Sequence, residues 1–320
     1  MRAMVQISYG SAEVIVPQEI AKPSPGIKEI LIRIHAAKVG PSDISFRKGD
    51  PLMIKFIYGW SRPKYAIGGV EFAGEVEAVG QEVKHFKAGD RLVGMSVKNF
   101  GAYAEYMCLT EESPLSVIPD AITFEEAVGV CDGGATALTF LRDKAKLRKG
   151  QKVLINGASG AVGIYAVQLA KYYGAEVTGV CSAGNEDLVR KAGADFIIDY
   201  TQEDFTKADK AYDVVFDAVG KRSFSVCRRV LVPKGIYLTT ALKLSIVLQM
   251  MWTSLYKGKR AVFATAGLMQ NKANLAFLMK LTRKGTLNAV IDRRYPLELL
   301  PDAHKYVETE RKQGNVIIKF

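Results

Sequence analysis

The sequence contains few cysteines, and they lie far apart. Its four cysteines, Cys108, Cys131, Cys181 and Cys227, form no Cys-x-x-Cys pair within the 320 residues. Disulfide-linked secreted domains and cysteine-based zinc sites both need clustered cysteines. The sequence therefore predicts neither a disulfide framework nor a cysteine zinc site, and we expect a reducing, cytoplasmic location.

Long hydrophobic runs are also missing. The most apolar stretch, Leu244 to Leu255, is interrupted by Gln249, whereas a membrane-spanning helix needs about 20 apolar residues. The N-terminal residues lack the apolar segment of a secretory signal. We therefore expect no membrane span, and we interpret the apolar stretch as a buried helix or an interface segment in preference to a membrane-surface segment.

Concentrated basic motifs are scarce, although the formal net charge is +11. Basic proteins can attract nucleic acids and acidic membranes. We interpret the Lys and Arg residues as scattered along the sequence, with short clusters at Lys257 to Arg260 and at Arg293-Arg294. No basic motif interleaved with aromatic residues supports nucleic-acid binding, so a nucleic-acid partner is not expected.

The residue pattern changes near residue 120. Before it, segments that mix β-branched and polar residues between Gly and Pro predict a β-rich region. After it, Thr123 and Glu126 form a capping-box pattern that opens a helix. Short apolar segments then alternate with helical ones; the predicted strands are 152–156, 176–181, 196–199, 213–217, 235–239 and 260–264, and the predicted helices are 161–173 and 186–192. This alternation predicts a parallel sheet with right-handed crossovers.

The C-terminal part returns to a β-like pattern. A predicted helix from 272 to about 284 precedes the alternating tail 314–320. This order indicates that the chain re-joins its first domain. We expect residues 1–120 and 272–320 to form a β-rich domain, and residues 121–271 to form a doubly wound α/β nucleotide-binding domain.

Three glycines, Gly157, Gly160 and Gly163, lie between a predicted strand and a predicted helix. Glycine permits the tight turn and a close approach of the backbone to a pyrophosphate, and the helix N-terminus favours the anion. Such glycines also occur in turns that only pack a helix on a strand, but the complete strand–turn–helix–strand unit favours a dinucleotide. The predicted contacts are Gly157, Ala158, Ser159, Gly160, Ala161, Val162 and Gly163.

The residues at the end of the next predicted strand indicate whether NAD or NADPH binds. NAD sites usually carry Asp or Glu there to bind the ribose hydroxyls. Here Ser182 follows Cys181, and the nearest acids, from Glu186 on, fall inside the next helix. Ser182 and Asn185 would tolerate a 2′-phosphate that a carboxylate repels, so the sequence predicts NADPH. Tyr200 is either a wall for that phosphate or an ordinary surface tyrosine.

Two long segments, Val153 to Lys171 and Gly68 to Gly80, resemble the medium-chain dehydrogenase/reductase superfamily, and more narrowly its zinc-independent quinone oxidoreductases. The runs 174–182, 192–195 and 86–93 match in order, so the resemblance covers nearly the whole chain. It implies a GroES-like catalytic domain made from both ends of the chain and a Rossmann domain between them, with the active site in the cleft.

The resemblance also implies roles for particular residues. Thr136 matches a threonine near the nicotinamide end of the cofactor, and the predicted strand 260–264 is where relatives pair to form a homodimer. Asp43 is interpreted as a residue that holds its loop. Many zinc-free relatives carry an asparagine near position 40, where this chain has Gly40.

Ligands for a catalytic zinc are missing at the matching positions. Zinc-dependent relatives carry a cysteine near Pro41 and a histidine where this chain has Val70. The three histidines, His35, His85 and His304, form no ligand cluster in the sequence. Because catalytic zinc needs three protein ligands, we expect a metal-free enzyme.

The expected reaction is hydride transfer from NADPH to a small hydrophobic electrophile, a quinone or an α,β-unsaturated carbonyl compound, helped by positioning and desolvation. Substrate-cleft candidates are Tyr58, Trp60 and Tyr65, with Phe56, all of which equally suit loop packing. The stretch Leu242 to Trp252 suits a cap on the cleft or a dimer contact. No proton donor is identified. The alternatives are an NADPH-binding protein without turnover, crystallin-like or nucleic-acid-binding, and an alcohol dehydrogenase.

Overall fold

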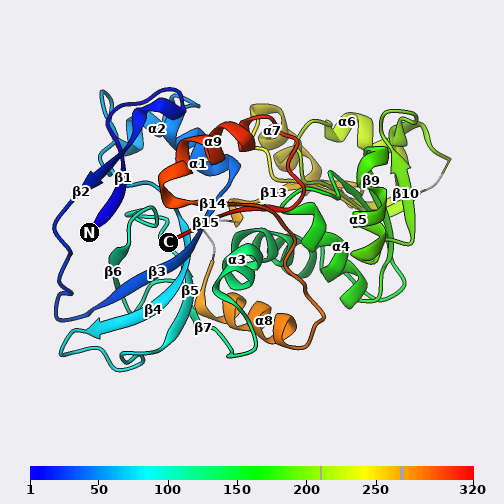
Figure 1. Ribbon diagram of the computed structural model, residues 1–320. Helices are drawn as coiled ribbons and strands as arrows, with labels where there is room; N and C mark the ends of the chain where they lie inside the picture. The colour runs from blue at the N-terminus through cyan, green and yellow to red at the C-terminus, as the bar shows by residue number, and fades with distance from the viewer. Residues whose placement is uncertain (210, 267–269) are drawn as a thin grey trace. The chain divides into compact units, whose positions relative to one another are not determined.

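The computed structural model describes residues 1–209, 211–266 and 270–320 (Figure 1). The chain divides into two compact units, Met1–Asp132 with Gln270–Phe320, and Gly133–Met269. The first is a β-rich unit built from both ends of the chain and the second a doubly wound α/β unit, which confirms the predicted α/β architecture. The domain boundaries expected after residues 120 and 271 stay a prediction.

The first unit is built on a seven-stranded sheet. Its strand order is β14-β15-β3-β4-β5-β7, with β6 paired to β3. The strands are β3 (Glu29–Val39), β4 (Glu71–Val79), β5 (Arg91–Met95), β6 (Tyr106–Thr110), β7 (Leu115–Val117), β14 (Ile291–Pro296) and β15 (Asn315–Lys319). Because β15 pairs antiparallel with β3, the C-terminal tail completes the N-terminal sheet, as its pattern predicted.

Smaller elements surround this sheet. A two-stranded ribbon joins β1 (Arg2–Gln6) to β2 (Ile15–Glu19). The helices are α1 (Pro41–Lys48), α2 (Met53–Tyr58), α8 (Lys272–Arg283) and α9 (Leu300–Glu308), with short 3-10 helices η1 (Ala12–Val14) and η7 (Leu297–Leu299). In α9, the buried Leu300, Ala303 and Val307 recur at helical spacing and join Ile32 and Phe72 in one apolar core.

The second unit holds six parallel strands in the order β10-β9-β8-β11-β12-β13. They are β8 (Lys152–Asn156), β9 (Glu176–Cys181), β10 (Phe196–Asp199), β11 (Tyr212–Asp217), β12 (Leu231–Thr239) and β13 (Arg260–Phe263). All six match predicted strands, because short apolar runs are typical of buried parallel strands, and three of them, β8, β10 and β11, end in Asn or Asp. The order reverses direction beside β8, so the carboxyl ends of β8 and β11 flank the switch point where such sheets bind ligands.

Helices cover this sheet. They are α3 (Phe124–Leu138), α4 (Gly163–Tyr172), α5 (Glu186–Lys191), α6 (Phe224–Cys227) and α7 (Leu244–Ser254), with a π-helical turn η2 (Thr139–Lys144) and 3-10 turns η3 (Ala183–Asn185), η4 (Phe205–Lys207) and η5 (Arg228–Val230). The predicted capping box of α3 is confirmed, since the Thr123 N–H donates to Glu126 Oε2 over 2.8 Å and the Glu126 N–H donates to Thr123 Oγ1 over 3.2 Å.

The apolar helix α7 differs from the expected buried helix. Only Ile246 and Thr253 are buried in it, whereas Leu244 is 77% exposed and Met251 64%. The interpretation as a buried helix is therefore wrong, and the interface alternative stays open. Within the described ranges, no helix combines the length and apolar character that a membrane crossing requires.

Candidate cofactor turn and catalytic-unit site

The predicted phosphate turn follows β8 and leads into α4. Gly157 has a φ of +79°, a conformation that favours glycine. A Cβ atom at Gly163 would lie 2.0 Å from the Gly157 carbonyl oxygen, and one at Gly133 in α3 would lie 2.0 Å from the Ala161 carbonyl oxygen. The helix predicted to begin at Ala161 begins at Gly163 instead, because Ala161 and Val162 belong to the turn.

No side chain caps the N-terminus of α4. Its N-cap residue is the apolar Val162, which cannot occupy the helix N-terminus as a hydrogen-bond acceptor, and an uncapped helix N-terminus favours an anion. The turn residues from Ala158 to Val162 bridge the ends of β8 and α4, and Ala158 and Gly157 donate their N–H groups to the Val180 carbonyl oxygen over 3.0 and 3.1 Å. The turn fits a dinucleotide pyrophosphate.

Three polar residues predicted from separate segments lie together. The side-chain amide of Asn185 donates to the Ser159 hydroxyl and to the Ser182 hydroxyl, each over 3.2 Å. Ser159 belongs to the glycine turn, and Ser182 follows β9 directly. The end of β9 thus presents hydroxyl and amide groups where NAD sites usually present a carboxylate.

Tyr200 and Thr136 are the two remaining predicted cofactor contacts. Tyr200 is half exposed, and its N–H donates to the Cys181 carbonyl oxygen over 3.1 Å, which places it next to the Ser182 position. Thr136 is buried in α3, three residues after the close contact at Gly133. Residues three apart share a helix face, so Thr136 lies on the side of α3 that packs against the turn.

Sequence reasoning missed Asp217, the last residue of β11. Its carboxylate is fully buried and accepts bonds from Asn156 Nδ2 at 2.8 Å, the Gly220 N–H at 3.0 Å and the Arg222 N–H at 2.8 Å. Its loop also carries Val219, which leaves no room for a Cβ atom at Gly157. Asp217 therefore fixes the loop that supports the phosphate turn. An acidic residue that ends a buried strand was the available signal.

A buried ion cluster occupies the first unit. Lys38 Nζ lies 3.1 Å from Glu71 Oε2 and 3.3 Å from Asp132 Oδ2, and the Lys38 and Glu71 side chains are each 2% exposed. Asp43 lies close by, accepting the Gly40 N–H over 2.8 Å, which agrees with its interpretation as a loop-holding residue. The buried Tyr103 hydroxyl donates to the Lys38 carbonyl oxygen over 3.1 Å.

Burial changes the ionisation of this cluster. Burial raises the pKa of Glu71, and the Lys38 ammonium opposes that shift. Burial likewise raises the pKa of Asp43 to about 6. For Lys38, burial favours the neutral form, but the carboxylates of Glu71 and Asp132 outweigh it, so its pKa is raised. Lys38 therefore keeps its charge in the buried cluster, with Glu71 and Asp132 as its counter-ions.

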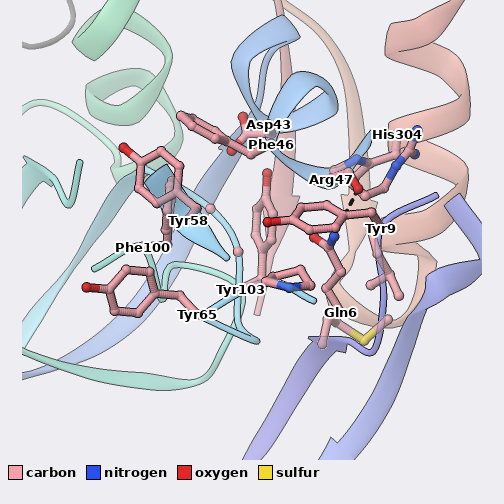
Figure 2. A pocket seen from close by; sticks show the side chains of 15 residues that line it. Gln6, Tyr9, Asp43, Phe46, Arg47, Tyr58, Tyr65, Phe100, Tyr103 and His304 are labelled. Atoms are coloured by element: carbon pink, nitrogen blue, oxygen red, sulfur yellow. Dashed lines mark hydrogen bonds between the residues drawn. The ribbon is translucent and has the colours of Figure 1, made fainter. Parts of the chain in front are cut away.

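An aromatic pocket lies in the same unit (Figure 2). Tyr58 and Tyr65 line it, and their rings lie 5.2 and 5.9 Å from the ring of Phe100. Trp60 does not line it: its side chain is 61% exposed and contacts the equally exposed Phe56, with ring centroids 4.8 Å apart. The structure thus brings two of the substrate-cleft candidates into one pocket and leaves Trp60 outside it.

The opposite side of the pocket is polar, and Figure 2 shows Arg47, His304, Tyr9 and Gln6 there. Arg47 and His304 are buried, whereas Tyr9 and Gln6 are partly exposed. Arg47 pairs with Glu308 and donates from Nε to the Gly10 carbonyl oxygen over 3.2 Å. Among the residues that the structure describes, neither Arg47 Nη1 nor either ring nitrogen of His304 has a hydrogen-bond partner. Burial, and then the Arg47 charge, lower the pKa of His304 to about 3.

The enclosed space in this pocket is small, about 40 Å³. A water molecule needs roughly 10–15 Å³ of such volume, so the space corresponds to about three waters. Tyr58 and Tyr65 lie on its aromatic side.

Comparison with known proteins identifies the family. Residues 26–120 match the model of the alcohol dehydrogenase GroES-like domain, and residues 192–318 match that of a zinc-binding dehydrogenase. A quinone oxidoreductase of Pseudomonas aeruginosa is 31% identical over 97% of both chains. The chain belongs to the medium-chain dehydrogenase/reductase superfamily. Its quinone oxidoreductase homologues confirm the resemblance stated from the sequence.

Two further relatives of this superfamily are informative. A 2-methylene-furan-3-one reductase of Solanum lycopersicum is 32% identical, covering 99% of this chain and 79% of its own length. The structure of Escherichia coli quinone oxidoreductase complexed with NADPH superposes with a TM-score of 0.84 at 26% identity, covering both chains completely. A nicotinamide-dependent oxidoreductase family is therefore established for this chain.

The zinc in the name of one family model does not fit the residues found here. This chain has no cysteine near Pro41, and Val70, at the position that matches a zinc-ligating histidine, offers no ligand atom. His35 is stacked on Phe124, with ring centroids 4.4 Å apart. Among the described residues, no group of three His, Cys, Asp or Glu side chains could hold a metal ion.

Proposed function

We propose that this chain is an NADPH-dependent, zinc-independent reductase of quinones or α,β-unsaturated carbonyl compounds. The observation that carries the proposal is the contact of Asn185 with Ser159 and Ser182 at the end of β9. Hydroxyl and amide groups suit a 2′-phosphate, whereas the carboxylate usual in NAD sites repels it. The names of the relatives support quinones and conjugated carbonyl compounds as acceptors.

The proposal assigns the cofactor contacts as follows. The backbone from Gly157 to Gly163 binds the pyrophosphate, Ser182 and Asn185 bind the 2′-phosphate with Tyr200 as a wall, and Thr136 lies at the nicotinamide end. When bound, NADPH supplies the hydride. The chain itself binds and orients both reactants and excludes water from them.

The proposed acceptor is small and hydrophobic, with Tyr58 and Tyr65 as its contacts at the pocket rim. The proposed assembly is a homodimer formed through β13, which ends the described six-stranded sheet. A cytoplasmic location stays a prediction from the isolated cysteines.

Turnover with a panel of acceptors tests this function. We expect simple quinones and enones to cause loss of the reduced-cofactor absorbance, faster with NADPH than with NADH. Tight NADPH binding without turnover on any acceptor, together with salt-sensitive RNA binding, would instead identify a binding protein. Oxidation of alcohols that depends on added zinc would identify an alcohol dehydrogenase.

A further inference from the structure

The positive charge of the chain is concentrated in one segment. No Asp or Glu occurs between Asp217 and Asp292, whereas residues 218–291 contain thirteen Lys and Arg residues. This segment therefore accounts for the whole net charge of +11. The interpretation of the basic residues as scattered is corrected, since their distribution becomes one-sided once the acidic residues are considered with them.

Helix α7 lies in the middle of this segment. Its buried side packs on β13, where the Ala261 N–H donates to Thr253 Oγ1 over 3.2 Å and the Phe263 N–H lies 3.2 Å from Met250 Sδ. Its outer side is apolar at helical spacing, which reverses the usual arrangement of a surface helix. The exposed apolar residues there are Leu244, Val247, Leu248, Met251, Trp252 and Leu255, with Leu242 and Tyr256 beside them.

Basic groups lie at both ends of α7. At its start, Lys243 Nζ donates to the Gly220 carbonyl oxygen over 2.7 Å, which brings it beside Lys221; Arg222, the next residue, is paired with Asp204 over 3.6 Å. After its end, Lys257 is exposed, and Lys259 Nζ donates to the Arg228 carbonyl oxygen over 2.7 Å. Arg229 and Arg260 add exposed charge there. An exposed apolar helix thus lies between two positive clusters.

We propose that this surface, the outer side of α7 with the basic groups at its two ends, docks on an anionic lipid bilayer. Apolar side chains of a surface helix enter the headgroup–acyl boundary, while Lys and Arg contact the lipid phosphates. Trp252 and Tyr256, with ring centroids 5.4 Å apart, are the aromatic types enriched at that boundary. The docking does not depend on the proposed reaction.

The positive charge of this surface favours an anionic bilayer over a second copy of the chain as its partner. Two copies meeting through this surface would bring together two sets of basic residues from a segment that has no acidic residue to pair with them. Such like-charge contact opposes association. An anionic bilayer offers negative charge and an apolar phase together, and so complements both features.

Vesicle flotation tests the proposal without any substrate. We expect the protein to float with phosphatidylcholine vesicles that contain phosphatidylglycerol, not with pure phosphatidylcholine, and to lose binding in high salt. The double variant Trp252→Ser/Leu255→Ser should bind about ten-fold more weakly, and Lys257→Gln about five-fold more weakly. The matched controls Phe196→Ser and Lys191→Gln, which change exposed residues of β10 and α5, should bind like the wild type.

Folding and assembly are measured in the same samples by circular dichroism and by light scattering after gel filtration. Wild-type protein that does not float with anionic vesicles, or that floats equally with neutral ones, overturns the proposal. So does a folded α7 variant that floats normally but has lost a dimer, because a second copy would then be the partner of this surface. Salt-sensitive RNA binding lost in Lys257→Gln, with no flotation, would also overturn it.

Discussion

The ammonium of Lys38 lies 3.1 Å from the carboxylate of Glu71, and both side chains are almost fully buried. Removing one partner of a buried ion pair costs about 3–5 kcal/mol, because the other is left uncompensated. We expect Lys38→Met to lower the free energy of unfolding, measured in urea at neutral pH, by roughly that amount. The double variant Lys38→Met/Glu71→Gln should recover part of the loss.

An exposed pair provides the control for this substitution. Lys28 Nζ lies 3.6 Å from Glu82 Oε2, with side chains 71% and 55% exposed. Exposed pairs contribute about 0–1 kcal/mol, so Lys28→Met should have little effect. Equal losses in Lys38→Met and Lys28→Met would contradict the description of Lys38 as the centre of a buried ion cluster.

The effect of replacing a glycine by alanine should depend strongly on where that glycine lies. Gly163→Ala places a Cβ atom 2.0 Å from a backbone oxygen, whereas a Cβ atom at Gly184 meets nothing within 4 Å. We expect Gly163→Ala to destabilise the chain by about 1–3 kcal/mol through overpacking and to weaken NADPH binding at least ten-fold, as measured by fluorescence titration. Gly184→Ala should behave like the wild type, and unimpaired NADPH binding by Gly163→Ala would count against the turn as the pyrophosphate site.

Ser182→Asp tests the choice of cofactor. A carboxylate at the end of β9 should repel a 2′-phosphate and accept bonds from ribose hydroxyls. We expect the dissociation constant for NADPH to rise by about ten-fold or more and that for NADH to change little or fall. Ser254→Asp, at the exposed end of α7, is the control. Tighter NADPH binding by Ser182→Asp would rule out Ser182 as a 2′-phosphate contact.

His304 predicts an acid-dependent loss of stability. Its pKa is about 3 in the folded chain and about 6.5 when unfolded. Because the folded pKa is the lower one, neutral His304 contributes stability above pH ~6.5, and this contribution falls by up to about 1.4 kcal/mol per unit as the pH drops towards 3. His304→Leu should flatten the pH dependence of the unfolding free energy in that window. An unchanged slope would contradict a buried, neutral His304.

The sequence predicted the strands of the second unit well, because the residue patterns that identify them are local. Strands 152–156 and 176–181 coincide with β8 and β9, since a short apolar run bounded by Gly or Asn identifies a buried strand without distant contacts. Ser182 and Asn185 are three residues apart, so their neighbourhood also follows from local spacing. Only their contact with Ser159 needed the fold.

The ion cluster of the first unit could not be predicted in the same way. Lys38, Glu71 and Asp132 are brought together by the pairing of β3 with β4 and by the middle of α3, and sequence spacing does not encode such contacts. A lysine inside the apolar run Ala36 to Val39 was the one local signal. For α7, apolar composition predicts burial, but the helix covers β13 with one side only and leaves the other exposed.

Turnover by metal-stripped protein tests the central claim most directly. The protein is dialysed against a strong chelator, its zinc content is measured, and NADPH oxidation is followed with a quinone and with an enone. We predict unchanged rates with far less than one zinc per chain, and a preference for NADPH over NADH. Loss of activity that returns only with stoichiometric zinc, or no turnover with any acceptor, would contradict a metal-free reductase.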